Sequence, residues 1–124
     1  MRKWLLLGLI MVGGYANSHQ LTPTYPVLTP SHIGGVYQTE MVMFNRREDI
    51  EYYQISVFDD DWNSVPFAAS ERIIRLPYLD RMAFTLYFRN EDKDRVRYIC
   101  TESKILKDEL QSAVVASRIC SKIK

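Results

Sequence analysis

The chain has 124 residues, enough for one domain with a hydrophobic core. Its 16 Lys and Arg residues nearly balance its 15 Asp and Glu residues, which argues against the basic surface that nucleic-acid binding requires. Its two cysteines and two histidines follow no spacing typical of a metal site.

Residues 1–18 have the pattern of a secretory signal peptide. A basic start precedes the apolar run 4–12, and Ala16 and Ser18 occupy the −3 and −1 positions of a cleavage site. The apolar run is shorter than the roughly 20 residues of a membrane-spanning helix. We therefore expect cleavage after Ser18 and a periplasmic protein without a stable transmembrane segment. Secretion and an uncleaved N-terminal anchor are the alternatives.

Cleavage would remove two basic residues and no acidic residue, so the mature chain of 106 residues would carry a net charge of −1. The mature chain divides into a proline-rich lead-in at 19–35 and one domain at 36–124. Proline fixes φ and removes a backbone donor, so the lead-in should be extended, either as an edge strand or as a segment that docks on a partner. Its candidate partner-binding residues are Pro23, Tyr25, Pro26 and Pro30.

From residue 36 onward apolar and polar residues alternate with a period of two, which predicts strands separated by polar turns. Seven to eight short strands at roughly ten-residue spacing are typical of an all-β sandwich or barrel. The buried faces should include residues 53, 55 and 57 of one strand and 82, 84, 86 and 88 of another. The strands expected before the C-terminal segment are 36–44, 51–58, 64–67, 72–76, 82–89 and 95–105.

The C-terminal segment is open to two interpretations. Apolar residues at helical spacing over 107–119 favour an amphipathic helix, whereas a strand at 113–123 would return beside 95–105. We favour the hairpin, because an antiparallel register that places Cys100 opposite Cys120 also produces favourable pairs. Those pairs are Glu102 with Arg118 and Ile105 with Val115.

An even pair of cysteines in an exported chain predicts a disulfide, Cys100–Cys120. Its role should be structural, because the pair is not spaced as Cys-x-x-Cys.

Catalytic and metal motifs are weak. Asp59, Asp61 and Asn63 match the first ligand positions of a calcium loop, but Ser70 stands where the bidentate acid belongs, so we expect a solvated turn. With both histidines in the N-terminal stretch and both cysteines oxidised, no nucleophile lies near a base in the pattern. The sequence therefore predicts a non-enzyme without cofactor or metal.

Six arginines alternate with acidic residues in the middle and late strands. Ion pairing on a solvent-exposed face is the simpler interpretation. An arginine face that binds a partner's carboxylates is the functional one, because guanidinium binds carboxylates at two points. On the second interpretation Arg72 and Arg75 join Val115 and Ile119 of the terminal strand as candidate partner-binding residues.

Five short motifs follow one another along the region 42–104. They are Phe44-Asn45, the strand 53–57, the Asp-rich turn followed by Val65-Pro66, the run 72–77 and Phe84-x-Leu86-x-Phe88. In this order they resemble the N-terminal immunoglobulin-like domain of periplasmic pilus-assembly chaperones, which implies a single immunoglobulin-like β-sandwich with an extended N-terminal lead-in. Those chaperones have two domains and a partner-binding strand with a row of large apolar residues. The comparable positions here, 115, 117, 119 and 121, are half serine.

Together these features predict a non-catalytic periplasmic protein-binding module. It would be a structural or accessory component of a secretion, conjugation or pilus assembly, and would bind protein partners in the cell envelope by edge-strand pairing. The alternatives are a secreted or virion-associated adhesion or decoration protein and a small periplasmic inhibitor of an enzyme.

Overall fold

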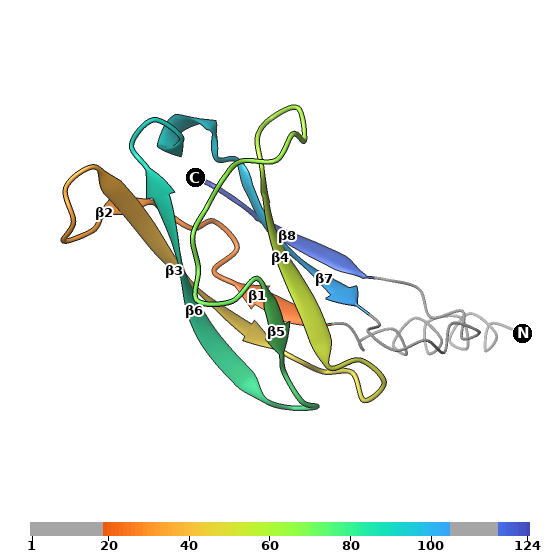
Figure 1. Ribbon diagram of the computed structural model, residues 1–124. Helices are drawn as coiled ribbons and strands as arrows, with labels where there is room; N and C mark the ends of the chain where they lie inside the picture. Colours follow the sequence, from red (N-terminus) through yellow and green to blue (C-terminus); the bar gives the residue numbers. More distant parts are fainter. Residues whose placement is uncertain (1–18, 105–116) are drawn as a thin grey trace, which may run out of the picture.

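Two antiparallel β-sheets pack face to face in the computed structural model, which describes residues 19–104 and 117–124 (Figure 1). Within these residues the expected all-β sandwich is confirmed, with eight strands and one short 3₁₀ turn, η1 (Lys93–Arg95). No helix in this part of the chain is long and apolar enough to span a membrane. Sheet A contains β1 (Gln20–Thr22), β2 (Thr29–Pro30), β3 (Val36–Phe44) and β6 (Arg81–Arg89), and sheet B contains, in spatial order, β5 (Ile73–Arg75), β4 (Tyr52–Phe58), β7 (Tyr98–Lys104) and β8 (Arg118–Lys122).

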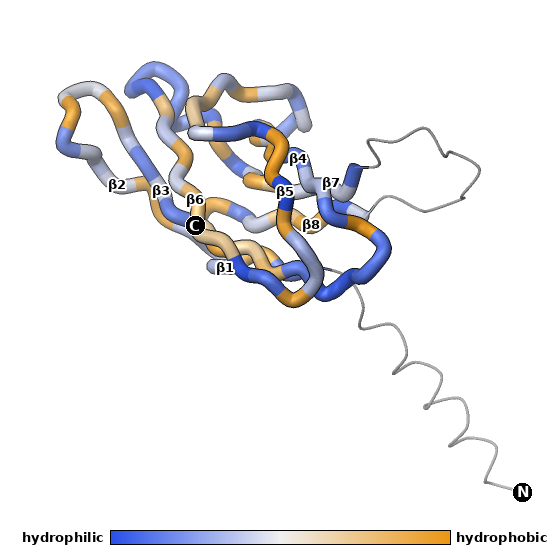
Figure 2. The backbone as a smooth tube through the Cα atoms, turned by 60° about the horizontal axis from the view of Figure 1, so that its bottom comes forward, coloured by the Kyte–Doolittle hydropathy of each residue, from blue (hydrophilic) through white to orange (hydrophobic). Residues whose placement is uncertain are grey.

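The period-two alternation of the sequence produces the inner faces of both sheets. Hydrophobic and hydrophilic residues alternate along the strands in Figure 2. Tyr53, Ile55 and Val57 of β4 are fully buried, as predicted, and so are Leu86 and Phe88 of β6. Burial of such side chains contributes about 1.5–3 kcal/mol each, which makes the inner faces the main source of stability.

In sheet A, β3 is the central strand. It pairs along its whole length with β6, while β1 and β2 share its other edge. The lead-in is therefore an edge element of the sandwich, as one of its two interpretations predicted. Between β1 and β2 the chain crosses to sheet B, where the backbone N–H groups of Lys122 and Lys124 donate to the carbonyl oxygens of Thr24 and Pro26 at 3.0 and 3.1 Å.

The register predicted for the C-terminal hairpin is confirmed over the residues that the structure describes. Cys100 faces Cys120 and Glu102 faces Arg118 across β7 and β8. The helix considered for 107–119 is wrong at its C-terminal end, because Arg118 already belongs to β8. The predicted pair of Ile105 and Val115 lies outside the described residues.

Two predicted strands differ from the structure. The segment 64–67 forms only an isolated bridge from Ser64 to Phe58, since Pro66 has no N–H to donate and a ladder cannot continue through it. The strand expected to begin at residue 95 begins at Tyr98. Residues 93–95 form η1 instead, because the buried carboxylate of Asp92 accepts hydrogen bonds from Arg89 and Arg95 and holds a turn there.

Candidate protein-binding edge

The outer edge of β8 is one of the two borders of sheet B, the other being β5. Residues 117 and 123 point their backbone groups at β7: Ser117 C=O accepts from Ser103 N–H, and Ile123 N–H donates to Arg97 C=O. Since backbone direction alternates along a strand, the N–H and C=O groups of Arg118 and Cys120 point away from β7. Among the described residues these groups have no backbone partner.

The C-terminal half of the same edge, at residues 122–124, is covered by the lead-in. The bonds from Lys122 and Lys124 to Thr24 and Pro26 run in the parallel sense, so the lead-in acts as a short strand beside β8. In a parallel ladder the carbonyl of Lys122 would accept from residue 26, but that residue is a proline without an N–H. The covering segment therefore cannot build a complete ladder, and the open part of the edge begins at Cys120.

A cross-strand disulfide holds this edge on the sheet. Cys100 and Cys120 lie directly opposite each other with their Cα atoms 4.0 Å apart, and their sulfur atoms are bonded. Residue 120 belongs to the pair that does not exchange backbone hydrogen bonds, in which side chains approach most closely. The predicted disulfide is thus confirmed, and it fixes β8 in register while leaving its outer backbone groups free.

An aromatic cluster, defined here as Phe58, Trp62 and Tyr98, covers the outer face of sheet B next to β8. Trp62 stacks on Tyr98 with ring centroids 4.2 Å apart, and the guanidinium of Arg118 lies 5.3 Å from the centre of the Phe58 ring. Trp62 has φ = 63°, a left-handed conformation that is uncommon for bulky residues. The stacking contact offsets that conformational cost. The sequence pattern indicates only that Trp62 lies in the acidic turn 59–63. It does not predict the stacking contact, because Tyr98 is distant along the chain.

Three predicted partner-binding residues of the lead-in lie near this edge. Pro23, Tyr25 and Pro26 flank or form the segment that covers the C-terminal half of this edge, and Tyr25 is 62% exposed. Pro30 is farther away, paired with Tyr37 of β3. Ile119 belongs to β8, but its side chain packs against the core. Val115 lies outside the described residues.

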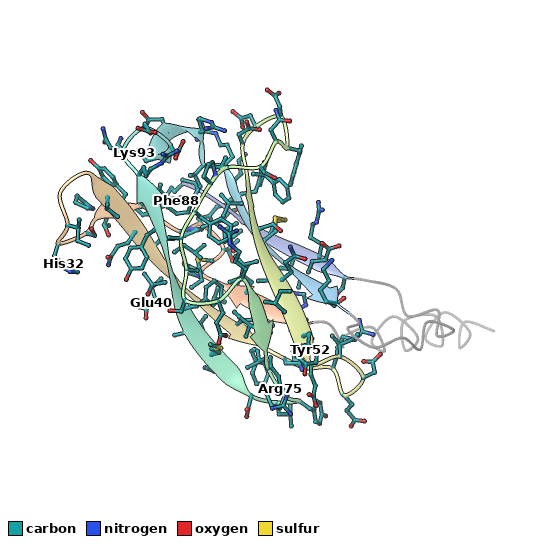
Figure 3. All side chains as sticks on the ribbon, viewed as in Figure 1. His32, Glu40, Tyr52, Arg75, Phe88 and Lys93 are labelled. Atoms are coloured by element: carbon teal, nitrogen blue, oxygen red, sulfur yellow. A yellow bond between two sulfur atoms is a disulfide. The ribbon has the colours of Figure 1, made fainter. Side chains whose placement is uncertain are left out.

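The structure does not bring Arg72 and Arg75 to this edge. They flank and end β5 at the opposite border of sheet B. Figure 3 shows Arg75 next to Tyr52, its register partner. The Arg75 guanidinium binds Glu51 at 3.1 Å, and Arg72 donates to the carbonyl of Phe67 while lying over its ring.

The other arginines of the predicted set are mostly engaged in ion pairs. Arg89 and Arg95 share the carboxylate of Asp92, and Arg97 binds Asp60 at 3.1 Å. The Arg97–Asp60 pair is exposed and contributes little stability, whereas the carboxylate of Asp92 is buried between its two arginines. The simpler interpretation of the arginine pattern, ion pairing, therefore accounts for most of it.

His19, the first described residue, lies in the core. Its Nε2 atom is 2.8 Å from the hydroxyl of Thr101 on β7, and its ring centroid is 4.6 Å from that of Tyr53. Burial lowers the pKa of His19 to about 4, against the raising effect of its hydrogen bond to the Thr101 backbone; the charge of Arg47 lowers the pKa further. Sequence reasoning missed this residue because its partner is 82 positions away.

The acidic turn after β4 is stabilised by hydrogen bonds among its own residues. One carboxylate oxygen of Asp59 accepts the N–H groups of Asp61 and Asn63, both at 2.9 Å, so it is occupied by the backbone. In residues 19–104 and 117–124 no three acidic, histidine or cysteine residues gather as metal ligands. The arrangement that remains available for function is a strand edge with a neighbouring aromatic surface.

Comparison with known proteins supports the fold. No family model and no curated protein sequence matches the chain. Among solved structures, the Escherichia coli chaperone DraB superposes with a TM-score of 0.63 and 17% identity, over 86% of this chain and 53% of DraB. The ASH/PapD-like domain 7 of human CEP192 superposes with a TM-score of 0.50 and 10% identity, over 87% of this chain and 86% of that domain.

At these identities the comparison establishes an immunoglobulin-like, PapD-like sandwich. The resemblance to pilus-chaperone domains is thus confirmed for the fold, and the chain spans about half the length of DraB. The class of protein that these comparisons define is an immunoglobulin-like, PapD-like β-sandwich.

Proposed function

We propose that this protein is a non-catalytic, exported protein-binding module of the bacterial cell envelope. It binds an extended segment of a partner protein along the outer edge of β8, as an accessory or structural component of a secretion, conjugation or pilus assembly. The observation that carries the proposal is the open half of that edge, where the backbone groups of Arg118 and Cys120 point outward without a partner among the described residues.

Strand addition at this edge is physically favourable. Each backbone hydrogen bond contributes a net of about 0.5–1.5 kcal/mol, and an edge supplies one per residue on average. The disulfide and the bonds to the lead-in hold β8 in the conformation that a new strand requires, so little ordering remains for the binding step.

Two further features support the proposal. DraB is a chaperone and shares this fold, and the signal-peptide pattern of residues 1–18 favours export. The basic side chains of Arg118 and Lys122 on β8 favour a partner strand that is neutral or acidic, because like charges opposite each other destabilise a sheet.

The proposal is tested with a proline at an outward-facing position. Arg118→Pro removes one outward N–H but keeps the bonds between β7 and β8, because the backbone of residue 118 points away from β7. We expect this variant to have a melting temperature close to that of the wild type. It should no longer co-purify with the envelope partner that the wild type retains after mild crosslinking. Arg118→Ala keeps the N–H and should retain the partner.

A matched control is Ile119→Pro, whose N–H points at β7, so this variant should destabilise the domain itself. Retention of the partner by folded Arg118→Pro, at the wild-type level, would show that the β8 edge is not the binding site. Loss of the partner in Arg118→Ala as well would assign the contact to the guanidinium and contradict strand addition.

A further inference from the structure

Sheet A has its own open edge, on β6. Tyr87 exchanges two backbone hydrogen bonds of 2.9 Å with Ala68, so the odd-numbered residues of β6 direct their backbone groups away from β3. Ala83 and Thr85 belong to this set, and their N–H and C=O groups find no backbone partner in the part of the chain that the structure describes. A cavity of about 230 Å³ separates this stretch from Ser70 and Glu71.

Features that usually protect a strand edge are missing from this stretch of β6. It has no proline between residues 81 and 89, and its two outward positions carry the small side chains of Ala83 and Thr85. An unprotected edge of this kind is a template for another strand. The β8 edge differs, because Arg118 and Lys122 would face the same basic residues of a second copy.

We propose that two copies of this chain form a symmetric dimer by antiparallel pairing of their β6 edges. With the twofold axis at Phe84, Ala83 faces the partner's Thr85 and Thr85 faces the partner's Ala83. Both positions direct their backbone groups outward, so each pair exchanges two hydrogen bonds, and sheet A continues across the dimer. The ladder ends there, because Ala68 occupies the edge at Tyr87.

Charge complementarity supports this register. In this register Arg81 lies opposite the partner's Tyr87, just beyond the last hydrogen-bonded pair, and therefore close to the partner's 68–71 segment. Glu71 of that segment lines the same cavity as Thr85 and Tyr87. Neither Arg81 nor Glu71 forms an ion pair with another described residue; the guanidinium of Arg81 lies 5.3 Å from the centre of the Phe44 ring. Twofold symmetry would form the Arg81–Glu71 contact twice.

The dimer would also cover apolar surface. Ile74, Met82 and Phe84 line the same cavity at the open border between the sheets. Met82 and Phe84 pack against the core but remain partly exposed. Pairing at the axis brings the partner's Phe84 to the rim of this cavity, so the hydrophobic effect adds to the four backbone hydrogen bonds. A contact of this size is below that of a stable obligate dimer, so association should depend on concentration.

Sedimentation velocity of the intact, disulfide-bonded chain tests the proposal. We expect the wild type to change from monomer to dimer as its concentration rises through the micromolar range. Thr85→Pro, which removes an outward N–H, should stay monomeric, and Thr85→Ser should dimerise as the wild type does. A wild type that stays monomeric, or a Thr85→Pro variant that dimerises normally, overturns the proposal.

A charge exchange tests the register without touching the backbone. Glu71→Arg or Arg81→Glu alone should weaken the dimer by about tenfold, because two contacts change in a symmetric dimer. The double variant Glu71→Arg/Arg81→Glu should restore it. Failure of the restoration overturns this register. Arg118→Pro should leave dimerisation unchanged, which separates this inference from the function proposed for β8.

Discussion

At the scale of single residues, one buried amide connects two loops and strand β4 at one end of the sandwich. The Nδ2 group of Asn45 donates to the carbonyls of Ile50 and Leu76, both at 2.8 Å. Its Oδ1 atom accepts from the Tyr53 hydroxyl at 2.6 Å and from the Arg47 N–H at 2.8 Å. All hydrogen-bonding capacity of the side chain is therefore used, and only an amide can supply two donors and two acceptors in this geometry.

Replacement of Asn45 should be among the most destabilising single changes in the domain. Asn45→Ala leaves the Tyr53 hydroxyl and two carbonyl oxygens without that partner, at about 1–3 kcal/mol each. We expect the free energy of unfolding, measured by urea denaturation, to fall by at least about 3 kcal/mol. Tyr53→Phe removes only one of the bonds and should cost less. A loss below 1 kcal/mol in Asn45→Ala would contradict a structural role.

At the scale of elements, the sequence predicted best those strands whose pattern is local. Strand 36–44 has the predicted bounds, and the predicted strands 51–58 and 82–89 are each within one residue of β4 and β6. Cysteine pairing predicted the β7–β8 register because a disulfide restricts the alternatives to one. The crossing of the lead-in from sheet A to β8 was not predictable, since its bonds join residues about a hundred positions apart in sequence.

The disulfide should contribute strongly to the stability of this hairpin. Its cysteines are 20 residues apart, and closing a loop of that size in the unfolded chain is worth about 3 kcal/mol in the chain-entropy model. Cys100→Ser with Cys120→Ser should lower the melting temperature by about ten degrees or more, as measured by calorimetry. Non-reducing peptide mapping should link the two cysteine peptides. Two free thiols in protein purified without reductant would contradict the pairing.

At the scale of the whole molecule, the N-terminal segment belongs to the core although the sequence predicts a lead-in. His19 and Leu21 are buried, and β1 pairs with β3. Deletion of the segment would therefore remove part of the domain together with any docking function, so single substitutions are the appropriate test of the edge. Sequence patterns predicted the strands and the disulfide, but the open edges depend on which strands become neighbours in space.

The burial of His19 makes the stability of the whole domain depend on pH. The folded state holds the pKa of His19 at about 4, mainly because burial disfavours the charged ring, whereas the unfolded chain has the ordinary value of 6.5. Between these values the unfolded chain binds more protons than the folded domain, so stability falls as the pH is lowered through this range.

The loss expected from His19 is on the order of 2–3 kcal/mol between pH 7 and pH 4, as measured by urea denaturation across the range. His19→Gln keeps a polar side chain but cannot titrate, so its stability should change less over the same interval. The difference between the two curves isolates the histidine from the carboxylates, which titrate in both proteins. Parallel curves for wild type and His19→Gln would show that the ring is not held neutral in the core.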